Sequence, residues 1–264
     1  MLPFLRAKKI ELPSKTIILA GKEVSICGSP DDGYFGNMQG QVLANSFLER
    51  VAAERLGPDA VIFDIGANIG LTTILFANHA PKGRVTSFEP SPVAFKFLKD
   101  TIAANRLTNA EAVNVALGAA TGEFPFMDDP GSATASHLSM DGTLGQPTHM
   151  VRVEKLDDTA RNHTRLDFIK IDVEGHERGV LEGGLSTIKR LKPLLFVEVN
   201  AFTLMAYGND NSRAFLEYLQ TLFSDIQYMD DEGIKHVNTK HELWRFLHTN
   251  LIHHGCVSDI LCIP

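Results

Sequence analysis

The chain has 264 residues, of which 44% are hydrophobic and 22% charged, and its formal net charge is −7. This composition is that of an ordinary globular protein, and the length allows one large α/β domain with an extension or two small domains. The acidic balance argues against nucleic acid as a partner, because proteins that bind the phosphate backbone usually carry a basic surplus.

The first 58 residues are expected to form an N-terminal extension that acts as a lid or flank. Two β-prone pieces, 16–19 and 24–27, are separated by a glycine-containing turn and predict a hairpin. Apolar residues at near-helical spacing predict a helix from about 41 to 56, which Gly57 and Pro58 end.

From residue 59 to 264, strand and helix patterns alternate and predict a second unit. Strands are expected at 61–65, 84–88, 112–116, 167–173, 193–199, 226–229 and 257–263, and helices at 71–79, 91–105, 177–190 and 211–223. Apolar strands that alternate with helices indicate a parallel sheet covered on both faces. The periodicity fails between 118 and 150, which predicts a long polar loop with one hairpin, 123–127 against 150–153.

The cysteines and the apolar pattern bear on the compartment. There are three cysteines and no Cys-x-x-Cys pair, which favours buried thiols over a disulfide framework or a zinc site. Residues 1–9 lack the apolar core of a signal peptide, and no stretch approaches about 18 apolar residues. The sequence therefore predicts a cytoplasmic protein without a membrane span, and a homodimer is among the expectations.

A glycine-rich turn follows the first strand of the alternating region, in the run Asp-Ile-Gly-Ala-Asn-Ile-Gly from Asp64 to Gly70. Gly66 and Gly70 allow a ligand to approach the backbone, and the helix that follows points its free N–H groups at the same place. A nicotinamide fingerprint would have the pattern Gly-x-Gly-x-x-Gly, which is absent here. A carboxylate at Asp64 would repel a pyrophosphate but could bind an ammonium group.

A second acid, Glu89, ends the next strand and precedes Pro90. Its expected role is to accept hydrogen bonds from two ribose hydroxyls, as the acid after the second strand does in dinucleotide-binding folds. Acids on two neighbouring strands suit a ligand with an amino acid part and a ribose, and S-adenosylmethionine is such a ligand. We expect Asp64 and Glu89 to face one crevice.

Four stretches together resemble the FkbM family of class I S-adenosylmethionine-dependent methyltransferases: 61–70, 88–90, 169–177 and 197–199. The similarity covers about residues 40–200 and, more loosely, the terminal strand. It implies a Rossmann-like α/β fold with a seven-stranded, mostly parallel sheet of order 3-2-1-4-5-7-6 and helices on both faces. It also implies methyl transfer to a hydroxyl of a sugar, glycan or natural-product small molecule.

The expected cofactor site follows from the turn, the strand ends and the resemblance. Asn68 should lie near the methionine part of the cofactor, and the backbone after the third strand should hold adenine. The residues expected to bind S-adenosylmethionine are Asp64, Gly66, Ala67, Asn68, Gly70, Glu89, Pro90, Asn114, Val115, Ala116 and Asp172.

The candidate catalytic residues lie at the ends of the fourth and fifth strands or in the turn after the fourth: Asp172, Glu174, His176 and Glu198. Asp172 could bind the methionine amino group, orient the acceptor, or only stabilise a helix N-terminus. Glu174 could accept the hydroxyl proton, bind the substrate or cap the helix. His176 suits a base near neutral pH, although a histidine at a helix start is often a surface residue.

The resemblance implies no metal ion in this site. A less favoured arrangement would join Asp172, Glu198 and Asn200 in an oxygen-rich Mg²⁺ site. Ser132, Ser136 and His137 in the long loop are further candidates for contact with the acceptor, and a solvated loop is the alternative.

Two other functions stay open as hypotheses. A nicotinamide-dependent oxidoreductase would also carry a glycine-rich turn, but the missing third glycine and the acid before the turn argue against it. A methyltransferase-like binding protein without turnover is the second alternative, and the intact acids and glycines argue against it.

Overall fold

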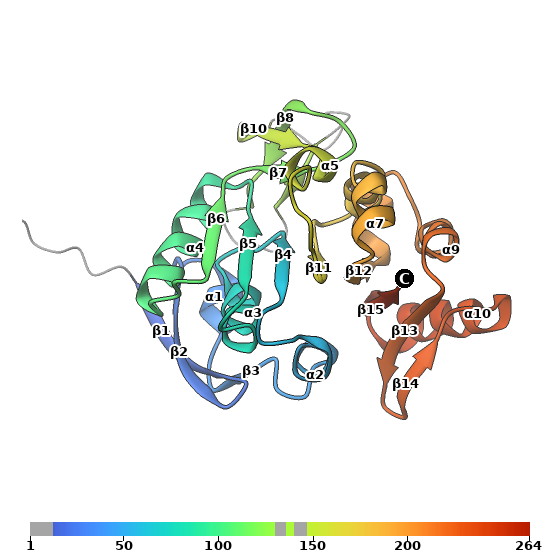
Figure 1. Ribbon diagram of the computed structural model, residues 1–264, viewed down its shortest axis with the longest axis horizontal. Helices are drawn as coiled ribbons and strands as arrows, with labels where there is room; N and C mark the ends of the chain where they lie inside the picture. The colour runs from blue at the N-terminus through green and yellow to red at the C-terminus, as the bar shows by residue number, and fades with distance from the viewer. Residues whose placement is uncertain (1–12, 130–135, 140–146) are drawn as a thin grey trace, which may run out of the picture.

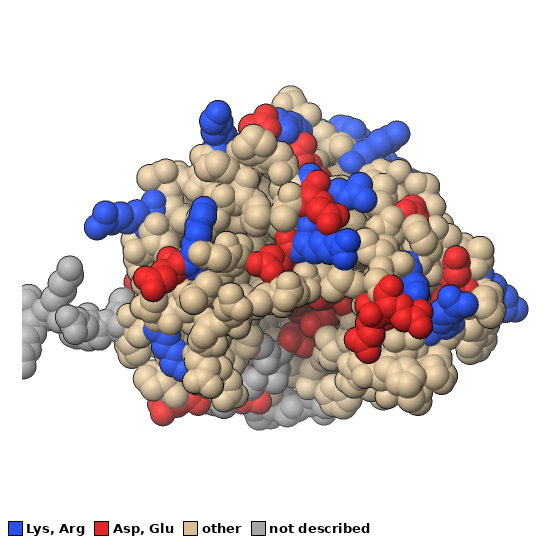
Figure 2. All heavy atoms as spheres, turned by 90° about the horizontal axis from the view of Figure 1, so that it is seen from below, with Lys and Arg blue, Asp and Glu red and all other residues tan. Residues whose placement is uncertain are grey.

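The computed structural model describes residues 13–129, 136–139 and 147–264, and Ser132 lies outside these ranges (Figure 1). The described residues form three sheets, with eight, four and three strands. Among the described helices, none has both the length and the apolar character needed to cross a membrane. Figure 2 shows one face of the molecule, where acidic and basic side chains are interspersed and form no continuous basic surface.

The large sheet runs in the order β14-β13-β15-β12-β11-β4-β5-β6. Its strands are β4 (Val61–Ile65), β5 (Arg84–Phe88), β6 (Ala110–Val113), β11 (Phe168–Ile171), β12 (Leu194–Asn200), β13 (Asp225–Asp230), β14 (Gly233–His236) and β15 (Val257–Ile263). The strands from β6 to β12 are parallel, and β15 lies antiparallel between β12 and β13. Numbered along the chain without β14, the order reads 3-2-1-4-5-7-6. The expected count of seven strands was wrong by one, because the chain turns back after Asp230 and adds β14 at the edge.

The helices largely follow the sequence pattern. They are α1 (Gly33–Asn37), α2 (Phe47–Arg55), α3 (Leu71–His79), α4 (Pro92–Ala104), α5 (Leu156–Thr159), α6 (Glu177–Glu182), α7 (Leu185–Leu191), α8 (Ala201–Ala206), α9 (Ser212–Leu222) and α10 (Lys240–His248), followed by the π-helix η2 (Thr249–His253). Ser91 caps α4 and Pro92 opens it, as the sequence predicts.

Two predicted helices differ from the structure. The helix expected from 41 begins at Phe47, because the Ser46 side chain caps that point and residues 41–42 form a short strand. The helix expected over 177–190 is broken at Gly183 and Gly184. A Cβ at Gly183 would lie 2.0 Å from the carbonyl oxygen of Gly118, so the helices are interrupted where another loop presses against them.

The large sheet is covered on both faces, and strand parity decides which face each residue meets. Ile62 and Phe168 pack with α2, α3 and the N-terminal hairpin. Phe63 and Ile169, their neighbours along the strands, pack on the other face with α6, α7 and α9. Both faces of the central strands are therefore buried, as a parallel sheet requires.

The N-terminal extension contains the predicted hairpin, which is confirmed. Its strands are β1 (Ser14–Leu19) and β2 (Lys22–Cys27), and β3 (Gln41–Val42) pairs with β1. Ile17 and Leu19 belong to the same buried cluster as Ile62 of the central strand β4. Strand β2 packs against α4, and α2 of the extension packs against α3, so the extension covers these helices (Figure 1).

The described parts of the segment between 118 and 150 contain more β-structure than the predicted polar loop with one hairpin. The expected hairpin forms between β8 (Gly122–Met127) and β10 (His149–Glu154). The short strands β7 (Ala116–Leu117) and β9 (His137–Leu138) complete a four-stranded sheet, with Phe126, Leu138 and Val151 in its own small core. Apolar residues in this segment are too few and too spread for a clear period, so the sequence alone did not reveal the sheet.

Candidate active site

A cavity of about 310 Å³ opens at the carboxyl ends of β4, β5, β11 and β12. Ligands in open α/β sheets bind at this edge, where the strand order reverses. The wall combines the glycine turn, the ends of these strands, β9 of the small sheet and parts of the N-terminal extension. From the expected site, the wall includes Gly66, Ala67, Asn68, Glu89, Pro90, Val115, Ala116, Asp172, Glu174 and Glu198.

Asp64 is not among the residues that line the cavity, and its expected role, to bind an ammonium group of the cofactor directly or through water, stays a prediction. Its side chain has no exposed surface, and its Oδ2 accepts hydrogen bonds from the hydroxyls of Thr72 at 2.9 Å and Thr73 at 2.7 Å. Strand parity turns this carboxylate toward α3, whose first turn carries both threonines. Asp64 therefore anchors the start of α3 beneath the glycine turn.

Lys170 of β11 is the charged partner of Asp64, and the sequence analysis missed it. It lies opposite Asp64 in the strand register, with its Nζ 3.9 Å from Asp64 Oδ1 and 3.1 Å from Asp172 Oδ2. The same Nζ donates to the carbonyl oxygen of Gly66 at 2.9 Å. Burial alone would lower the pKa of Lys170, but Asp172 and Asp64 outweigh it and raise that pKa. Burial raises the pKa of Asp64, and Lys170 and the two threonines oppose this rise.

The glycine turn is shaped by packing as much as by ligand access. Gly66 has φ +77°, and a Cβ there would lie 1.8 Å from the carbonyl oxygen of Asp172. Gly70 is not part of the cavity wall, and a Cβ there would lie 2.9 Å from Leu98 of α4. Gly70 therefore lets α3 begin and pack against α4, and its expected contact with a ligand stays a prediction. Asn68, at φ +49°, does line the cavity.

Glu89 lies in the cavity wall and is held by two backbone amides. Its Oε2 accepts from the Asn68 N–H at 2.8 Å, and its Oε1 accepts from the Ser91 N–H at 2.8 Å. Burial raises the pKa of Glu89 to about 7, although both amides oppose the shift. Asn114 is outside the wall and instead donates to the carbonyl oxygens of Glu89 and Pro90, so it supports the loop that carries Glu89.

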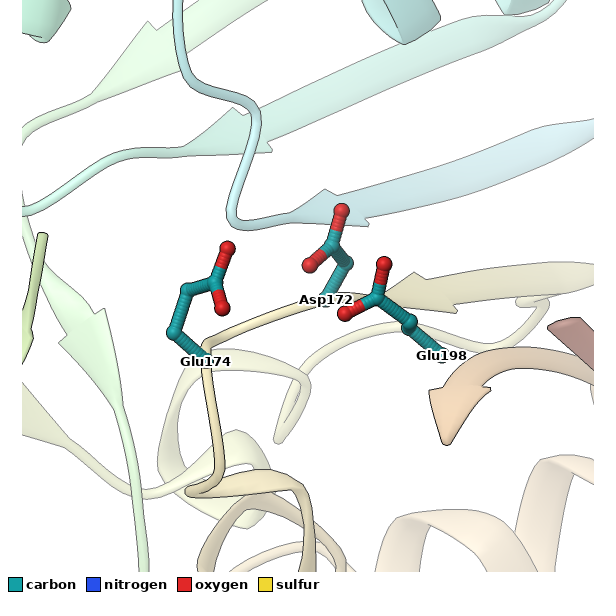
Figure 3. A group of neighbouring side chains, drawn as sticks. All are labelled: Asp172, Glu174 and Glu198. Carbon is teal, nitrogen blue, oxygen red and sulfur yellow. The ribbon is translucent and has the colours of Figure 1, made fainter. Parts of the chain in front are cut away.

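Three carboxylates meet on the opposite side of the cavity. Asp172 and Glu174 come from the turn after β11, and Glu198 comes from β12; Figure 3 shows their carboxyl groups pointing toward one another. One oxygen from each lies within 4.8 Å of the other two. Burial and the charge of Asp172 raise the pKa of Glu174 to about 8. The same two causes raise the pKa of Glu198 well above its ordinary value.

The turn that carries Glu174 is strained and braced. Glu174 has φ +52°, a conformation that costs a residue with a side chain and that clusters at functional sites. Glu177 is buried, and its Oε1 accepts from the N–H groups of Val173 and Gly175 at 3.1 Å each. His176 caps α6, is outside the cavity wall and has its Nε2 2.8 Å from the carbonyl oxygen of Leu138 in β9. The structure therefore places His176 between the turn and the small sheet, outside the cavity wall.

Several residues of the wall come from segments where the sequence analysis had no specific signal. Tyr34 of α1 and Asp259 of β15 both line the cavity, and so does Leu138. Burial raises the pKa of Tyr34 to about 12. Ser136 and His137, expected near the acceptor, line the cavity too, and the His137 ring stacks on Tyr207 at 3.6 Å between centroids. Asp259 could have been noticed in the sequence only because it is an acid in the middle of the apolar terminal strand.

The fold and the cavity define a Rossmann-like α/β protein of the class I methyltransferase type. A family model, the methyltransferase FkbM domain, matches residues 64–229, and the chain belongs to this family. The match includes the glycine turn, Glu89 and the three converging carboxylates, while Tyr34 and Asp259 lie outside it.

The relatives agree with this assignment. The chain is 28% identical over 151 residues to the 2-O-methyltransferase NoeI of Sinorhizobium fredii, covering 51% of this chain and 61% of NoeI. It is 27% identical over 154 residues to the hexuronic acid methyltransferase AglP of Haloferax volcanii, covering 58% of this chain and 61% of AglP. The crystal structure of an FkbM methyltransferase from Methylobacillus flagellatus superposes with a TM-score of 0.51 at 17% identity, covering 81% of this chain and 46% of that one. The chain thus spans about three fifths of the length of these two curated relatives.

Proposed function

We propose that this protein is an S-adenosylmethionine-dependent O-methyltransferase that acts on a hydroxyl of a sugar, glycan or related natural product. One observation carries the proposal most. Glu89 is fixed by two backbone amides at the edge of a cavity that also contains the glycine turn and, across from it, three carboxylates. This arrangement provides one place for a nucleoside and another for a hydroxyl group.

The residues on the nucleoside side fit S-adenosylmethionine. Each Glu89 oxygen uses one lone pair for a backbone amide and keeps capacity for a ribose hydroxyl. The Asn68 Oδ1 is buried and has no hydrogen-bond partner among the described residues, although Asn68 lines the cavity. A buried acceptor without a donor is costly, and a bound amino group would satisfy it. Val115 and Ala116 offer an apolar wall for adenine.

The residues on the other side fit the acceptor. When bound, S-adenosylmethionine supplies a methyl group that its positive sulfur has already activated. The chain must hold an oxygen about 3 Å from that methyl group and receive the hydroxyl proton. Asp172, Glu174 and Glu198 are three of the acidic groups that line this part of the cavity, and we assign acceptor binding and proton acceptance to them. We assign His176 the role of positioning β9, because its ring contacts the carbonyl oxygen of Leu138. Leu138 and His137 of β9 line the cavity, and His176 does not.

The acceptor class rests on the relatives. NoeI and AglP are named for methyl transfer to a 2-hydroxyl position and to a hexuronic acid. A sugar hydroxyl is therefore the first acceptor to test in this chain.

Calorimetry with S-adenosylhomocysteine tests the nucleoside side. We expect binding, and we expect Glu89→Gln to weaken it at least tenfold because one acceptor for the ribose becomes a donor. Glu182→Gln, an exposed change on α6, is the matched control and should leave the affinity unchanged. Tight binding of NADH with no binding of S-adenosylhomocysteine would overturn the proposal.

Methyl transfer from labelled S-adenosylmethionine to a panel of sugars and uronic acids tests the acceptor side. Glu174→Gln should lower turnover by about 10²–10⁴ if this carboxylate takes part in proton transfer. S-adenosylhomocysteine affinity should change less than threefold in that variant, which separates the two sides of the cavity. Nucleoside binding without turnover on any acceptor would favour a binding protein instead.

A further inference from the structure

Within the described part of the chain, two of the three converging carboxylates, Glu174 and Glu198, lack the donors that enclosed acids normally have, whereas Asp172 is paired with Lys170. Among the described residues, no hydrogen bond reaches the carboxyl groups of Glu174 or Glu198. Buried polar groups are usually paired, and each exception requires an explanation.

The nearby positive charge, on Lys170, already has its own partners. Lys170 has three N–H donors, and its Nζ contacts Asp172 Oδ2 at 3.1 Å, Gly66 O at 2.9 Å and, more loosely, Asp64 Oδ1 at 3.9 Å. It is the one lysine or arginine among the described residues that lines the cavity. One lysine therefore faces more negative charge in this wall than it can neutralise.

A fourth carboxylate, on another strand, also lacks a hydrogen-bond donor in the part of the chain that the structure describes. Asp259 of β15 is directly opposite Glu198 in the antiparallel register, where like charges are unfavourable. Its carboxyl group is enclosed by protein on nearly all sides, contributes to the cavity wall and has no hydrogen-bond donor among the described residues. Asp259 is outside the converging triad, and its nearest strand neighbour is a second unpaired acid. Such a pair is explained if a cation occupies the space in front of it.

We propose that Asp172, Glu174 and Glu198 bind one divalent cation of the Mg²⁺, Mn²⁺ or Ca²⁺ class, with Asp259 behind Glu198 adding to the negative field. Carboxylate oxygens are the ligands that such hard cations prefer. Oxygens on opposite sides of one ion would be about 4.2 Å apart for Mg²⁺ and about 4.8 Å apart for Ca²⁺. The three oxygens here, all within 4.8 Å of one another, meet the limit for Ca²⁺ and come close to the limit for Mg²⁺.

This site differs from both expectations of the sequence analysis, which favoured no metal and otherwise chose Asn200 as a ligand. The Asn200 Oδ1 accepts from the N–H groups of Phe202 and Thr203 at the start of α8, so it is used as a helix cap. Glu174 takes its place because the strained turn at φ +52° brings its carboxyl group toward Asp172. Three protein oxygens leave about three of six positions for water. If the proposed function holds, oxygens of the acceptor can take them.

Binding of Mn²⁺ to the full chain, followed by electron paramagnetic resonance, tests the site without substrate or cofactor. We expect one bound Mn²⁺ per chain, displaced by Mg²⁺ or Ca²⁺. Glu198→Gln and Glu174→Gln should each weaken Mn²⁺ binding at least about tenfold. Asp259→Asn should weaken it less, because Asp259 acts through charge alone. Glu123→Gln, an exposed change on β8, is the matched control and should bind Mn²⁺ as the unchanged chain does.

A thermal melt of the same proteins distinguishes a cation site from a merely structural cluster. Without metal, Glu198→Gln should melt at or above the temperature of the unchanged chain, because it removes repulsion with Asp259. With Mn²⁺, only the unchanged chain and Glu123→Gln should gain a large upward shift. Absence of Mn²⁺ binding at millimolar concentration, or equal binding by Glu198→Gln and Glu174→Gln, would overturn the proposal. Neither result depends on methyl transfer, so a failure here is separate from a failure of the proposed function.

Discussion

Replacing Lys170 with methionine tests the buried ion pair beneath the glycine turn. Lys170 has a side chain that is 7% exposed and lies opposite Asp64, whose side chain has no exposed surface. Methionine keeps the apolar length of lysine but removes the charge. The variant must then bury the Asp64 carboxylate without a cation or bind a proton there.

The free energy needed to protonate Asp64 sets the upper limit of the stability that Lys170→Met can lose. At pH 7, protonating an aspartate with an ordinary pKa near 3.9 costs about 4 kcal/mol, at about 1.4 kcal/mol for each pH unit. Burial already raises the pKa of Asp64, which reduces this figure. We therefore expect Lys170→Met to lower the free energy of unfolding by about 2–4 kcal/mol at pH 7, in line with the removal of one partner from a buried pair.

Urea unfolding at several pH values measures this cost. The folded-state pKa of Asp64 rises further in the variant, so the loss of stability should grow as the pH rises from 5 to 7 and shrink as the pH falls toward the unfolded-state pKa. Lys189→Met, an exposed change on α7, is the control and should cost less than about 0.5 kcal/mol. Equal stability of Lys170→Met and the unchanged chain at pH 7, or a loss that does not vary with pH, would refute the reasoning.

Two further predictions concern the nucleoside side of the cavity. Gly66→Ala should destabilise the protein by well over the roughly 1–2 kcal/mol that a positive φ costs alanine, because its Cβ would meet the carbonyl oxygen of Asp172; Gly21→Ala, at φ +75° with open space around it, should show that smaller cost alone in the same urea assay. A similar loss in both variants would contradict the packing argument. Burial raises the pKa of Glu89 to about 7, so S-adenosylhomocysteine affinity should decrease as the pH falls below about 7, by up to tenfold per unit, because protonation removes an acceptor for the ribose; in Glu89→Gln the calorimetric affinity should be flat over this range.

Local patterns predicted most elements of the fold. The hairpin β1-β2, the cap and proline at the start of α4, and the pair β8-β10 all follow from short-range signals, and each is confirmed. The break between α6 and α7 could not be predicted, because it depends on the carbonyl of Gly118 pressing on Gly183 from a distant loop. The same holds for β7 and β9, whose pairing depends on long-range contacts within the small sheet.

Local sequence also revealed part of the site. The sequence predicts Glu89 and the carboxylates at the ends of β11 and β12 near one cavity, because the ends of parallel strands meet at one edge of the sheet. Asp64 obeyed the same rule and yet lies outside the wall, since its side chain points toward Thr72 and Thr73. Position along a strand is therefore a weaker guide than the direction in which the side chain points.

The sequence by itself determined the family, the alternating strands and helices, and the glycine turn with its following acid, because these depend on residues close together along the chain. Only the tertiary structure showed that Lys170 neutralises Asp64, that Asp259 stands opposite Glu198, and that Tyr34 of the extension reaches the cavity. The two pairs join residues 106 positions apart (170 − 64) and 61 positions apart (259 − 198). They depend on strand register and on which face of the sheet each side chain meets, and neither can be read from one segment alone.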